Sequence, residues 1–443
     1  MSFKNIKTID NRTVAFTLEN VHVSYANTLR RLILTGVETV AFRSDMTSSG
    51  STTDVLVKHN DTPMTNEMLA DRIGLLPIHV EGPLMWKKDT YTFVLKVTGN
   101  KDSVRHVKSE DFKIIKNNDI PEVGDEEEDK KENPPLEDSS KFFPPNPITK
   151  DTCLIASLQP GTDTAMQELY IVAKATLGTG REHARFCPVS QCSYEYTVDN
   201  NEERMSALFD QWLIVSKKVG AIDKGSDRYQ QLLREYKTMQ MKRCFKINAK
   251  GEPYSFDFTI ETAGVLPVKY IVNRACEVGE NMCSRYANIG KGPLPEEITV
   301  TPSSSRIIGF DFLIKGQDHT FGNLIQTWLV ENIIEGDKGP KITYAGYSIP
   351  HPLRDEMLLR IGVKDGSEQT AKLALETAVK GCTKMFQELR ATWNNSYDST
   401  SQISPPVRRT LARKPQVASK PQVDLKPQEP QESQKVIVTK SPQ

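Results

Sequence analysis

The alternation of apolar and polar residues near the start of the chain predicts a strand followed by a helix. Val14, Phe16 and Leu18 alternate with mainly polar neighbours, as in a half-buried strand. The next apolar residues are spaced i, i+4, i+7 and i+8, which places them on one face of a helix. This first stripe consists of Tyr25, Leu29, Leu32 and Ile33. The basic pair Arg30 and Arg31 falls outside the stripe.

The same unit recurs in the second half of the chain. Phe310, Phe312 and Ile314 alternate as a strand. A second helical stripe follows with the same offsets, and it consists of Phe321, Ile325, Trp328 and Leu329. The shift that lays Asn323 on Asn27 also lays this stripe on the first, which indicates an internal repeat. We expect both asparagines to cap or orient the helix starts.

Further strands and one more helix are predicted between the two units. The strands are expected at Tyr91 to Val97, Ser193 to Val198 and Phe256 to Ile260, and the helix at Pro267 to Tyr286. The stretch Ala287 to Ser305 is rich in Gly, Pro, Thr and Ser, which is typical of a linker. This mixture predicts an α+β fold.

The last apolar stripe is the longest. It predicts one amphipathic helix from about Ser367 to Trp393, which would span about 40 Å at 1.5 Å per residue. Its apolar residues are Leu375, Val379, Cys382, Phe386, Leu389 and Trp393. So long a stripe should pack against another helix, in this chain or in a partner.

Charge and cysteine content narrow the classes of function. Lys and Arg number 57, as do Asp and Glu, so the net formal charge is zero and any nucleic-acid binding must be local. Residues 124–138 carry a charge of −6 and residues 405–443 a charge of +5, and we expect both to be disordered. The seven cysteines form no C-x-x-C pair, which favours a reducing compartment. Without a signal-peptide pattern or a long apolar segment, we expect a soluble intracellular protein.

A search for catalytic motifs gives mainly negatives. The chain has no P-loop, no nucleophile elbow and no H-E-x-x-H helix. Gly178 and Gly180 resemble the opening of a dinucleotide loop, but His183 stands where the motif needs its third Gly. Cys187 and Cys192 near His183 could hold a metal, although small core thiols fit this pattern better. His183 and Cys187 are the last candidates for a hydrolase or transferase.

Three motifs in the first half resemble one protein family. They are Asn27 to Arg31 (NTLRR), Asn66 to Ile78 (NEMLADRIGLLPI) and Gly178 to Val189 (GTGREHARFCPV). They look like segments of the assembly subunit of multisubunit DNA-directed RNA polymerases, which is the third-largest subunit in eukaryotes, the D-type protein in archaea and, more distantly, the amino-terminal domain of bacterial alpha. The third motif is similar to that subunit's Gly-x-x-x-Glu-His-Ala-Lys-Trp-x-Pro segment.

The second half resembles the smaller partner with which that subunit pairs, the archaeal L-type protein and its eukaryotic counterpart. The motifs are Asp318 to Leu324 (DHTFGNL) and Tyr344 to Leu353 (YAGYSIPHPL). In this family the two partners share a dimerisation fold and pack their first helices together, so a fused chain should contain the unit twice. A flexible linker of about 19 residues would span about 25 Å and make this dimerisation intramolecular. Such a fusion implies a large cytoplasmic DNA virus as the source.

The resemblance implies two copies of an alpha-subunit-type dimerisation fold in one α+β chain. The first copy comprises residues 1–43 and 190–290 and is interrupted by a mixed α/β insert domain, residues 44–189, with an acidic disordered loop at about 121–142. A linker, 291–305, leads to the second copy, 306–398, and a disordered basic tail, 399–443. Some relatives hold zinc or an iron-sulfur cluster through cysteines of the insert, but residues 44–150 contain no cysteine. No metal or other cofactor is therefore expected.

The family implies a non-catalytic role with no catalytic residue in this chain. The two halves should form an intramolecular pseudo-heterodimer that recruits the two largest polymerase subunits, with small polymerase subunits as further partners. DNA would be reached only through the complex, and neither a membrane nor a homo-oligomer is needed. A viral protein would work in the host cytoplasm, in viral factories, and in the virion, and otherwise the site would be the nucleus.

The resemblance also assigns interface residues. The expected large-subunit contacts are Arg30, Arg31, Arg72, Gly178, Gly180, Glu182, His183 and Arg185, because guanidinium groups suit pairing with carboxylates across an interface. The expected pseudo-dimer interface is Tyr25, Leu29, Leu32, Ile33, Phe321, Ile325, Trp328, Leu329, Leu375, Val379 and Phe386. For the arginines, a solvated helix face is the alternative. The competing function is a nucleic-acid-binding module that acts through tail residues Arg408, Arg409, Arg413 and Lys414.

Overall fold

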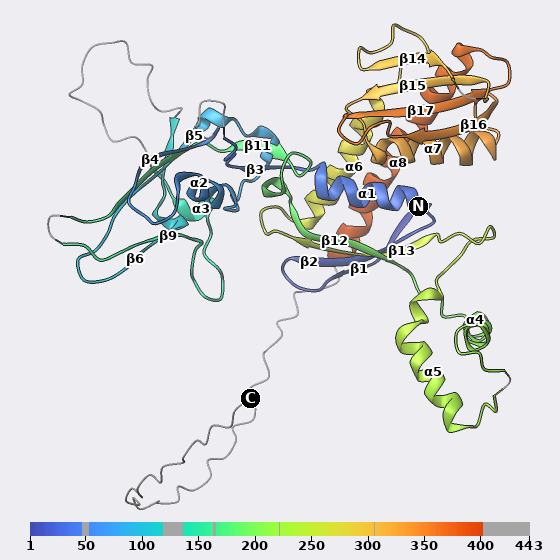
Figure 1. Ribbon diagram of the computed structural model, residues 1–443, viewed down its shortest axis with the longest axis horizontal. Helices are drawn as coiled ribbons and strands as arrows, with labels where there is room; N and C mark the ends of the chain where they lie inside the picture. Colours follow the sequence, from blue (N-terminus) through green and yellow to red (C-terminus); the bar gives the residue numbers. More distant parts are fainter. Residues whose placement is uncertain (47–52, 118–135, 163–164, 221, 305, 402–443) are drawn as a thin grey trace, which may run out of the picture. The chain divides into compact units, whose positions relative to one another are not determined.

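The computed structural model describes residues 1–46, 53–117, 136–162, 165–220, 222–304 and 306–401 (Figure 1). Their buried apolar side chains form three clusters. The largest cluster combines residues of both predicted dimerisation units, the second lies within the insert between Val40 and Ala175, and a small third cluster lies around Phe209. Within these described ranges, no helix is long and apolar enough to cross a membrane. The tail expected at 399–443 lies outside the described residues from 402 onward.

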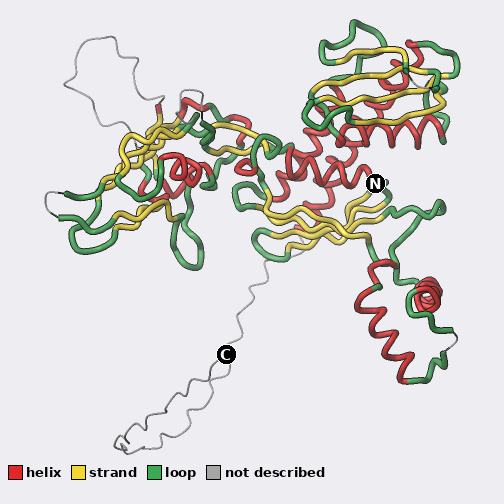
Figure 2. Tube along the Cα trace, viewed as in Figure 1, coloured by secondary structure: helices red, strands yellow, loops and turns green. Residues whose placement is uncertain are grey.

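An antiparallel sheet and two helices form the first unit (Figure 2). Along the sheet the strands are β1 (Ser2–Thr8), β2 (Thr13–Glu19), β13 (Ser255–Thr262) and β12 (Val189–Tyr196). The predicted alternation is confirmed, since Phe256, Phe258 and Ile260 of β13 are buried. The helices are α1 (Val23–Thr35) and α6 (Val268–Ser284), and both contact this sheet.

The second unit repeats this order of elements. Its antiparallel sheet runs β14 (Ile298–Pro302), β15 (Gly309–Lys315), β17 (Glu356–Val363), β16 (Ile342–Ser348). Its helices are α7 (His319–Leu329), which continues as a π-helical turn (Val330–Ile334), and α8 (Glu368–Ser401). The shift that lays Asn323 on Asn27 also lays both ends of β15 on those of β2, and the start of α7 on the start of α1. The internal repeat is therefore a structural repeat.

The expected linker at 291–305 is wrong for residues 298–302, which form strand β14 and pair with β15. Ile298 is buried and alternates with Thr299 and Thr301, so a two-residue period lay within a Thr-rich and Pro-rich stretch. The correction has a structural reason. Strand β14 occupies the edge position that β1 occupies in the first sheet, so the second unit is incomplete without it.

Three smaller expectations also need correction. The loop expected at about 121–142 is ordered at its end, because strand β8 (Leu136–Glu137) and helix α3 (Ser139–Phe142) follow residue 135 and Phe142 is buried. The tail expected from 399 is wrong for residues 399–401, because α8 continues to Ser401. Asn27 and Asn323 lie inside their helices. The caps are His22 and Asp318, whose side chains accept from the backbone N–H groups of Ser24 and Thr320.

The insert between β3 and β11 is a sheet with short helices. Its strands are β3 (Glu38–Ala41), β4 (Val55–Asn60), β5 (Tyr91–Thr98), β6 (Arg105–Lys108), β7 (Lys113–Lys116), β9 (Leu154–Leu158), β10 (Glu168–Ala173) and β11 (Thr176–Thr179), with helix α2 at Asn66–Gly74. Short 3-10 turns of the insert occupy Pro83–Met85, Lys88–Thr90 and Ser109–Asp111, and two further ones lie after β11, at Ala184–Phe186, and after α5, at Met241–Arg243. Four of these strands and β8 form one antiparallel sheet in the order β4-β10-β5-β7-β8. The insert core contains several edge-to-face aromatic pairs, such as Phe42 with Phe93.

A helical hairpin that the sequence pattern did not reveal lies between β12 and β13. It consists of α4 (Glu202–Val215) and α5 (Asp227–Met239), which pack through Phe209, Leu213 and Tyr236. Asn201 and Ser226 cap the two helices through their side chains. The apolar spacing of α5 would have predicted a helix, but its low content of aliphatic residues concealed it.

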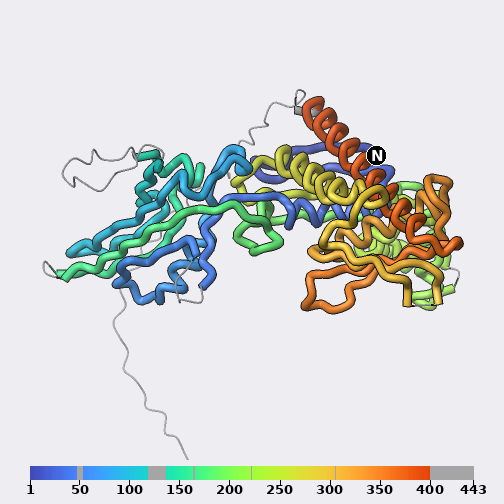
Figure 3. Tube along the Cα trace, turned by 90° about the horizontal axis from the view of Figure 1, so that it is seen from above, coloured from blue at the N-terminus to red at the C-terminus, as the bar shows by residue number. Residues whose placement is uncertain are grey.

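Helix α8 contacts elements of both units. It packs along α6, as Figure 3 shows, and also contacts β1 of the first sheet and β15 and β17 of the second. At its far end the fully buried Trp393 meets the rings of Phe3 and Phe16 at 5.1 and 5.2 Å between centroids. Its indole N–H donates to the carbonyl of Lys269 at 3.2 Å. The last helix of the second unit thus completes the core of the first.

Replacing Trp393 should therefore destabilise both units together. We expect Trp393→Ala to lower the free energy of unfolding by about 3–5 kcal/mol, because it leaves a large cavity between α8 and the first sheet. Urea unfolding followed by circular dichroism measures the change. Leu353→Ala is the control, since that side chain is 90% exposed and should cost less than about 0.5 kcal/mol. Equal losses for both variants would contradict this role of Trp393.

Candidate subunit interface

The two predicted helical stripes lie in one continuous core. All eleven residues expected at the pseudo-dimer interface are buried and belong to the largest hydrophobic cluster. Helix α1 contacts α7, and α6 packs along α8. In the second pair Gly279 of α6 faces α8, and a Cβ atom there would stand 2.7 Å from the ring of Phe386. Gly279 therefore lets α6 and α8 approach closely enough for that ring to fit between them.

Polar contacts between α1 and α7 come in reciprocal pairs. Ser24 of α1 lies against Thr327 and Asn323 of α7, with its Oγ 3.0 Å from Thr327 Oγ1 and 3.2 Å from Asn323 Nδ2. At the other end, Arg31 of α1 donates from Nε to Thr320 Oγ1 of α7 at 2.7 Å. Under the shift that relates the two units, Thr320 is the repeat partner of Ser24, and Thr327 is the repeat partner of Arg31. In a two-fold interface each contact between two residues occurs a second time with the two units exchanged, as it does here.

Asp318 links the start of α7 to the first unit. It caps the helix by accepting from Thr320 N–H at 2.7 Å, and it lies 3.5 Å from the guanidinium of Arg31. Burial raises the pKa of this carboxyl, but hydrogen bonds from Thr320 and the charges of Arg181 and Arg31 outweigh burial and lower it below the usual value. Asp318 therefore stays charged and holds both a helix end and a cation of the opposite unit.

A second set of contacts joins the units around the helices. Tyr25 Oη donates to the carboxylate of Glu331 at 2.6 Å, and burial together with this bond raises the pKa of the phenol. Arg181 bonds to Asp355 at 2.7 Å. On the other side, the carboxylate of Glu376 accepts from the backbone N–H of Gly290 at 2.8 Å. These bonds cross between residues 1–290 and residues 310–392 at three separate places.

The two arginines that follow Leu29 have different surroundings. Arg31 is engaged with the second unit through Thr320 and Asp318, as described above. Arg30 donates only to Asn27 of its own helix, at 3.0 Å, among the contacts of the described residues. It also lines a surface hollow of about 450 Å³ together with residues 192–196 of strand β12. Arg30 therefore remains available at the surface, while Arg31 holds the two units together.

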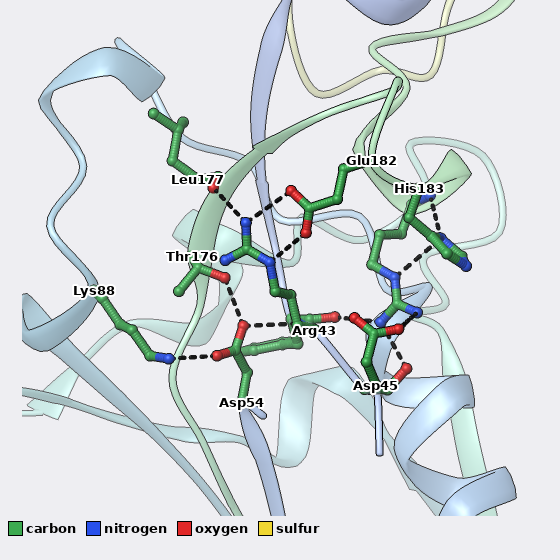
Figure 4. Close-up of polar contacts among 11 residues, drawn as sticks. Arg43, Asp45, Asp54, Lys88, Thr176, Leu177, Glu182 and His183 are labelled. Atoms are coloured by element: carbon green, nitrogen blue, oxygen red, sulfur yellow. Dashed lines mark hydrogen bonds and ion pairs between the residues drawn. The ribbon is translucent and has the colours of Figure 1, made fainter. Parts of the chain in front are cut away.

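The loop after β11 ties the insert to the first unit (Figure 4). Glu182 forms a two-pronged ion pair with Arg43, whose guanidinium also donates to the carbonyl of Leu177 and lies over the ring of Phe186 at 5.3 Å. Arg43 lowers the pKa of the Glu182 carboxyl, and Glu182 raises that of Arg43. This pair spans 139 residues of sequence and closes the entry and exit of the insert.

A buried carboxylate also stabilises the place where the chain enters and leaves the insert. The side chain of Asp54 is fully buried and accepts from Lys88 Nζ at 2.6 Å, Thr176 Oγ1 at 2.5 Å and the backbone N–H of Arg43 at 2.8 Å. Figure 4 shows it beneath Arg43. Three donors satisfy a charge that would otherwise be costly to bury.

The remaining residues expected at a large-subunit surface also make internal contacts. The side chain of Arg185 is 4% exposed, and it donates to the carbonyl of Phe42 at 2.8 Å and to Ser44 Oγ at 2.6 Å. His183 accepts from the backbone and side chain of Arg185. Arg72 donates to the carbonyl of Leu154 and is exposed. The structure thus brings Glu182, His183 and Arg185 together on one loop, and leaves Arg30 and Arg72 apart from it.

Steric contacts explain why the loop has glycine at two positions. A Cβ at Gly178 would stand 2.7 Å from the ring of Phe186, and one at Gly180 would overlap the backbone oxygen of Leu34. The loop therefore packs directly on the end of α1. Burial raises the pKa of the thiols of Cys187 and of Cys192, the latter to about 12, so both stay protonated. The residues that the structure describes contain no group of three His, Cys, Asp or Glu side chains arranged to hold a metal.

Sequence reasoning missed several residues on which this interface depends. Ser24, Thr320 and Thr327 are small polar residues inside apolar stripes, and Arg43 and Asp54 lie in no motif. The repeat offers one usable signal, because the shift that relates the two units pairs Ser24 with Thr320. For Arg43 and Asp54 no local pattern exists, since their partners are far away in sequence.

Comparison with known proteins gives concordant matches for both units. A family model described as the RNA polymerase Rpb3/Rpb11 dimerisation domain matches residues 15–283, and a second model with that description matches residues 310–392. Among curated relatives, the RPAC1 subunit of Homo sapiens DNA-directed RNA polymerases I and III is 26% identical over 63% of this chain and 81% of its own length. Subunit Rpo3 of Methanobrevibacter smithii is 26% identical, with 62% and 93% covered. The RPB3-11 homolog of African swine fever virus is 24% identical, with 74% of each chain covered.

The packing of the loop on α1 predicts that Gly180 tolerates no side chain. We expect Gly180→Ala to lower the free energy of unfolding by about 1–3 kcal/mol, because the added methyl group displaces the backbone of Leu34. Thermal unfolding measures this loss. Gly220→Ala is the matched control, since a Cβ there meets nothing within 4 Å and should change stability by less than about 0.5 kcal/mol. A Gly180→Ala protein as stable as the Gly220→Ala protein would refute the packing argument.

The ion pair of Arg43 and Glu182 predicts a dependence of stability on pH. The folded protein holds the pKa of Glu182 below the usual 4.5, so the folded state keeps the carboxylate charged where the unfolded chain binds a proton. The contribution is complete above about pH 4.5 and is lost as the pH falls through the lower folded pKa. Urea midpoints of the wild-type protein and Glu182→Gln should differ at pH 6 and converge toward pH 3.

The control for this titration is Glu296→Gln. Glu296 is exposed and has no ion pair with any residue in the described ranges. Its substitution should leave the midpoint nearly unchanged across the same pH range. If Glu182→Gln behaves like Glu296→Gln at pH 6, the ion pair does not stabilise the junction.

Proposed function

Because the chain belongs to the RNA polymerase Rpb3/Rpb11 dimerisation-domain family, we propose that it is an assembly subunit of a DNA-directed RNA polymerase that carries both dimerisation partners on one chain. The first unit takes the part of the Rpb3-type partner and the second unit that of the Rpb11-type partner. Together they form an intramolecular pseudo-heterodimer. Nucleotidyl transfer would belong to the two largest subunits, which this chain recruits.

The observation that carries the proposal is the reciprocal contact between α1 and α7. Ser24 contacts Thr327 and Arg31 contacts Thr320. A fold without an internal repeat would not contain such a pair of exchanged contacts. Two separate proteins that share one fold would form the same exchanged contacts when they dimerise. The domain boundaries expected from sequence, apart from the corrected linker and tail limits, belong to this proposal.

We assign the recruitment surface to the face that carries Arg30. Its guanidinium borders the hollow beside β12 and is not engaged with the second unit. Arg72, on α2, is a second exposed candidate. Arg31, Glu182, His183 and Arg185 would act on recruitment by holding the units and the loop in place, since their polar groups make internal contacts.

The viral relative supports a viral source for this chain, because its name, RPB3-11 homolog, also joins the two partners. A viral subunit of this kind would work in the host cytoplasm, in viral factories, and enter the virion. A cellular subunit would work in the nucleus. Small polymerase subunits are proposed as further partners in either case.

The test separates Arg30 from Arg31 in the complete protein. Tagged wild-type chain purified from its native source should bring down two very large subunits and template-dependent RNA synthesis. Arg30→Glu should lower recovery of those subunits at least tenfold without lowering the unfolding midpoint, because it acts only on the outer face. Mass spectrometry and an RNA-synthesis assay on the eluate measure both effects.

Lys364→Glu is the control, since this exposed lysine lies outside the Arg30 surface and should leave recovery unchanged. Arg31→Glu should instead lower the unfolding midpoint, because it places a carboxylate against Asp318. Recovery of the wild-type chain without large subunits would reject the assembly role. Full recovery with Arg30→Glu would reject only the assigned surface.

A further inference from the structure

The hairpin of α4 and α5 is an excursion with its own small core. It leaves the first sheet after β12 and returns before β13. Its apolar residues pack on one another around Phe209, Leu213 and Tyr236, and this cluster is separate from the core shared by the two dimerisation units. At the base, Arg204 bonds to Asp199 at 2.7 Å and to the carbonyl of Phe245 at 2.6 Å. The packing of the dimerisation core therefore does not explain why the chain contains this hairpin.

The second half of this excursion is strongly basic, although the whole chain is neutral. Residues 217–250 contain ten Lys or Arg and three Asp or Glu, which gives this short stretch a net charge of +7. Four of the ten cations pair with carboxylates. These are Lys217 with Glu235, Lys242 with Glu195, Lys246 with Glu19 and Lys250 with Glu335. The charge is therefore only partly neutralised.

Six cations of this stretch are exposed and form no ion pair within the described part of the chain. They are Lys218, Lys224, Arg228, Arg234, Lys237 and Arg243. Arg234 and Lys237 stand three residues apart on α5, on the face opposite Leu232 and Tyr236, and Gln230 adds an amide donor to that face. Asp227 and Glu235 are the acidic residues of α5, and Glu235 is already paired with Lys217. The outer face of α5 thus offers Arg234, Lys237 and Gln230 as donors, and Asp227 is the carboxylate on the same side of the helix.

We propose that the basic half of the hairpin, residues 217–220 and 222–243, binds the sugar-phosphate backbone of nucleic acid without sequence preference. Exposed cations that lack internal partners keep their full charge for a polyanion, and their binding releases the counterions that phosphates condense. The three donors on the outer face of α5 repeat along one helix, which suits a backbone of regularly spaced phosphates. This inference does not depend on the polymerase assignment, because the purified chain alone can test it.

The proposal predicts the size of the salt effect. If all six cations contact duplex phosphates, the logarithm of the binding constant should fall with that of the salt concentration with a slope of up to about −5, at about 0.9 for each contact. The interaction should not depend on base sequence. Fluorescence anisotropy with a labelled mixed-sequence duplex and a labelled single strand, each titrated with the full chain over a range of salt concentrations, measures the slope and compares the two nucleic-acid forms.

The decisive variant is Arg228→Gln, Arg234→Gln and Lys237→Gln in the full chain. Glutamine keeps helix propensity, so α5 should persist, and an unchanged circular dichroism spectrum and melting temperature verify this. We expect duplex affinity to fall about 10- to 100-fold at about 0.1 M salt and the slope to become shallower by about 2 to 3. The charge-matched control is Lys58→Gln, Lys113→Gln and Lys364→Gln, which removes three exposed cations elsewhere and should leave affinity unchanged.

A second variant separates the hairpin from the carboxyl-terminal tail. It neutralises Arg408, Arg409, Arg413 and Lys414 by Gln, and the hairpin should retain its share of affinity in this protein. Wild-type affinity and slope in the hairpin variant would overturn the proposal, as would loss of binding in the tail variant alone. If the hairpin variant binds DNA normally but recovers fewer polymerase subunits, the hairpin is a protein interface and the proposal is wrong.

Discussion

The structure depends on one constraint, which is that the apolar stripes of α1 and α7 are buried in one core that both units share. Each of these helices contacts the later helix of its own unit, α1 with α6 and α7 with α8, and α1 and α7 also contact each other. Apolar burial supplies the driving force but does not fix register. The reciprocal contacts of Ser24 with Thr327 and of Arg31 with Thr320 fix it, since a slip along either helix would strand buried hydroxyl groups.

Once the register of α1 and α7 is set, the length of α8 and the path of the insert determine how the remaining elements pack. Helix α8 is long enough to lie along α6 and still deliver Trp393 to the first sheet, so each unit completes the other. The insert leaves and re-enters the first unit beside α1, where Gly180 packs on the end of that helix. Arg43 and Glu182 close the two crossing strands, and Asp54 anchors them from below with three donors. The insert can thus hold a fixed position without adding apolar surface to the shared core.

Charge in this protein is organised locally. The neutral total conceals an acidic stretch before Asp138, a basic hairpin and a basic tail. Most ion pairs are partly exposed and contribute little to stability individually, so their value lies in orientation. Buried partners such as Asp54 differ, because an unsatisfied charge there would cost several kcal/mol. This separation lets the core determine assembly while exposed cations stay free for polyanions or partner proteins.

The sequence by itself determined which face of each helix and strand is apolar, and the tertiary structure decided which element packs against that face. Periodicity located β2, α1, β15, α7, α6 and α8, and the matching offsets of the two stripes revealed the repeat, because these signals depend only on neighbours within a few turns. It misjudged β14, whose short alternation was masked by Thr and Pro, and the α4–α5 hairpin. It could not show that Arg31 faces the second unit while Arg30 remains outside, since adjacent helical residues differ by only about 100° and the choice depends on where α7 packs. Contacts such as Arg43 with Glu182, 139 residues apart, exist only once the chain has folded.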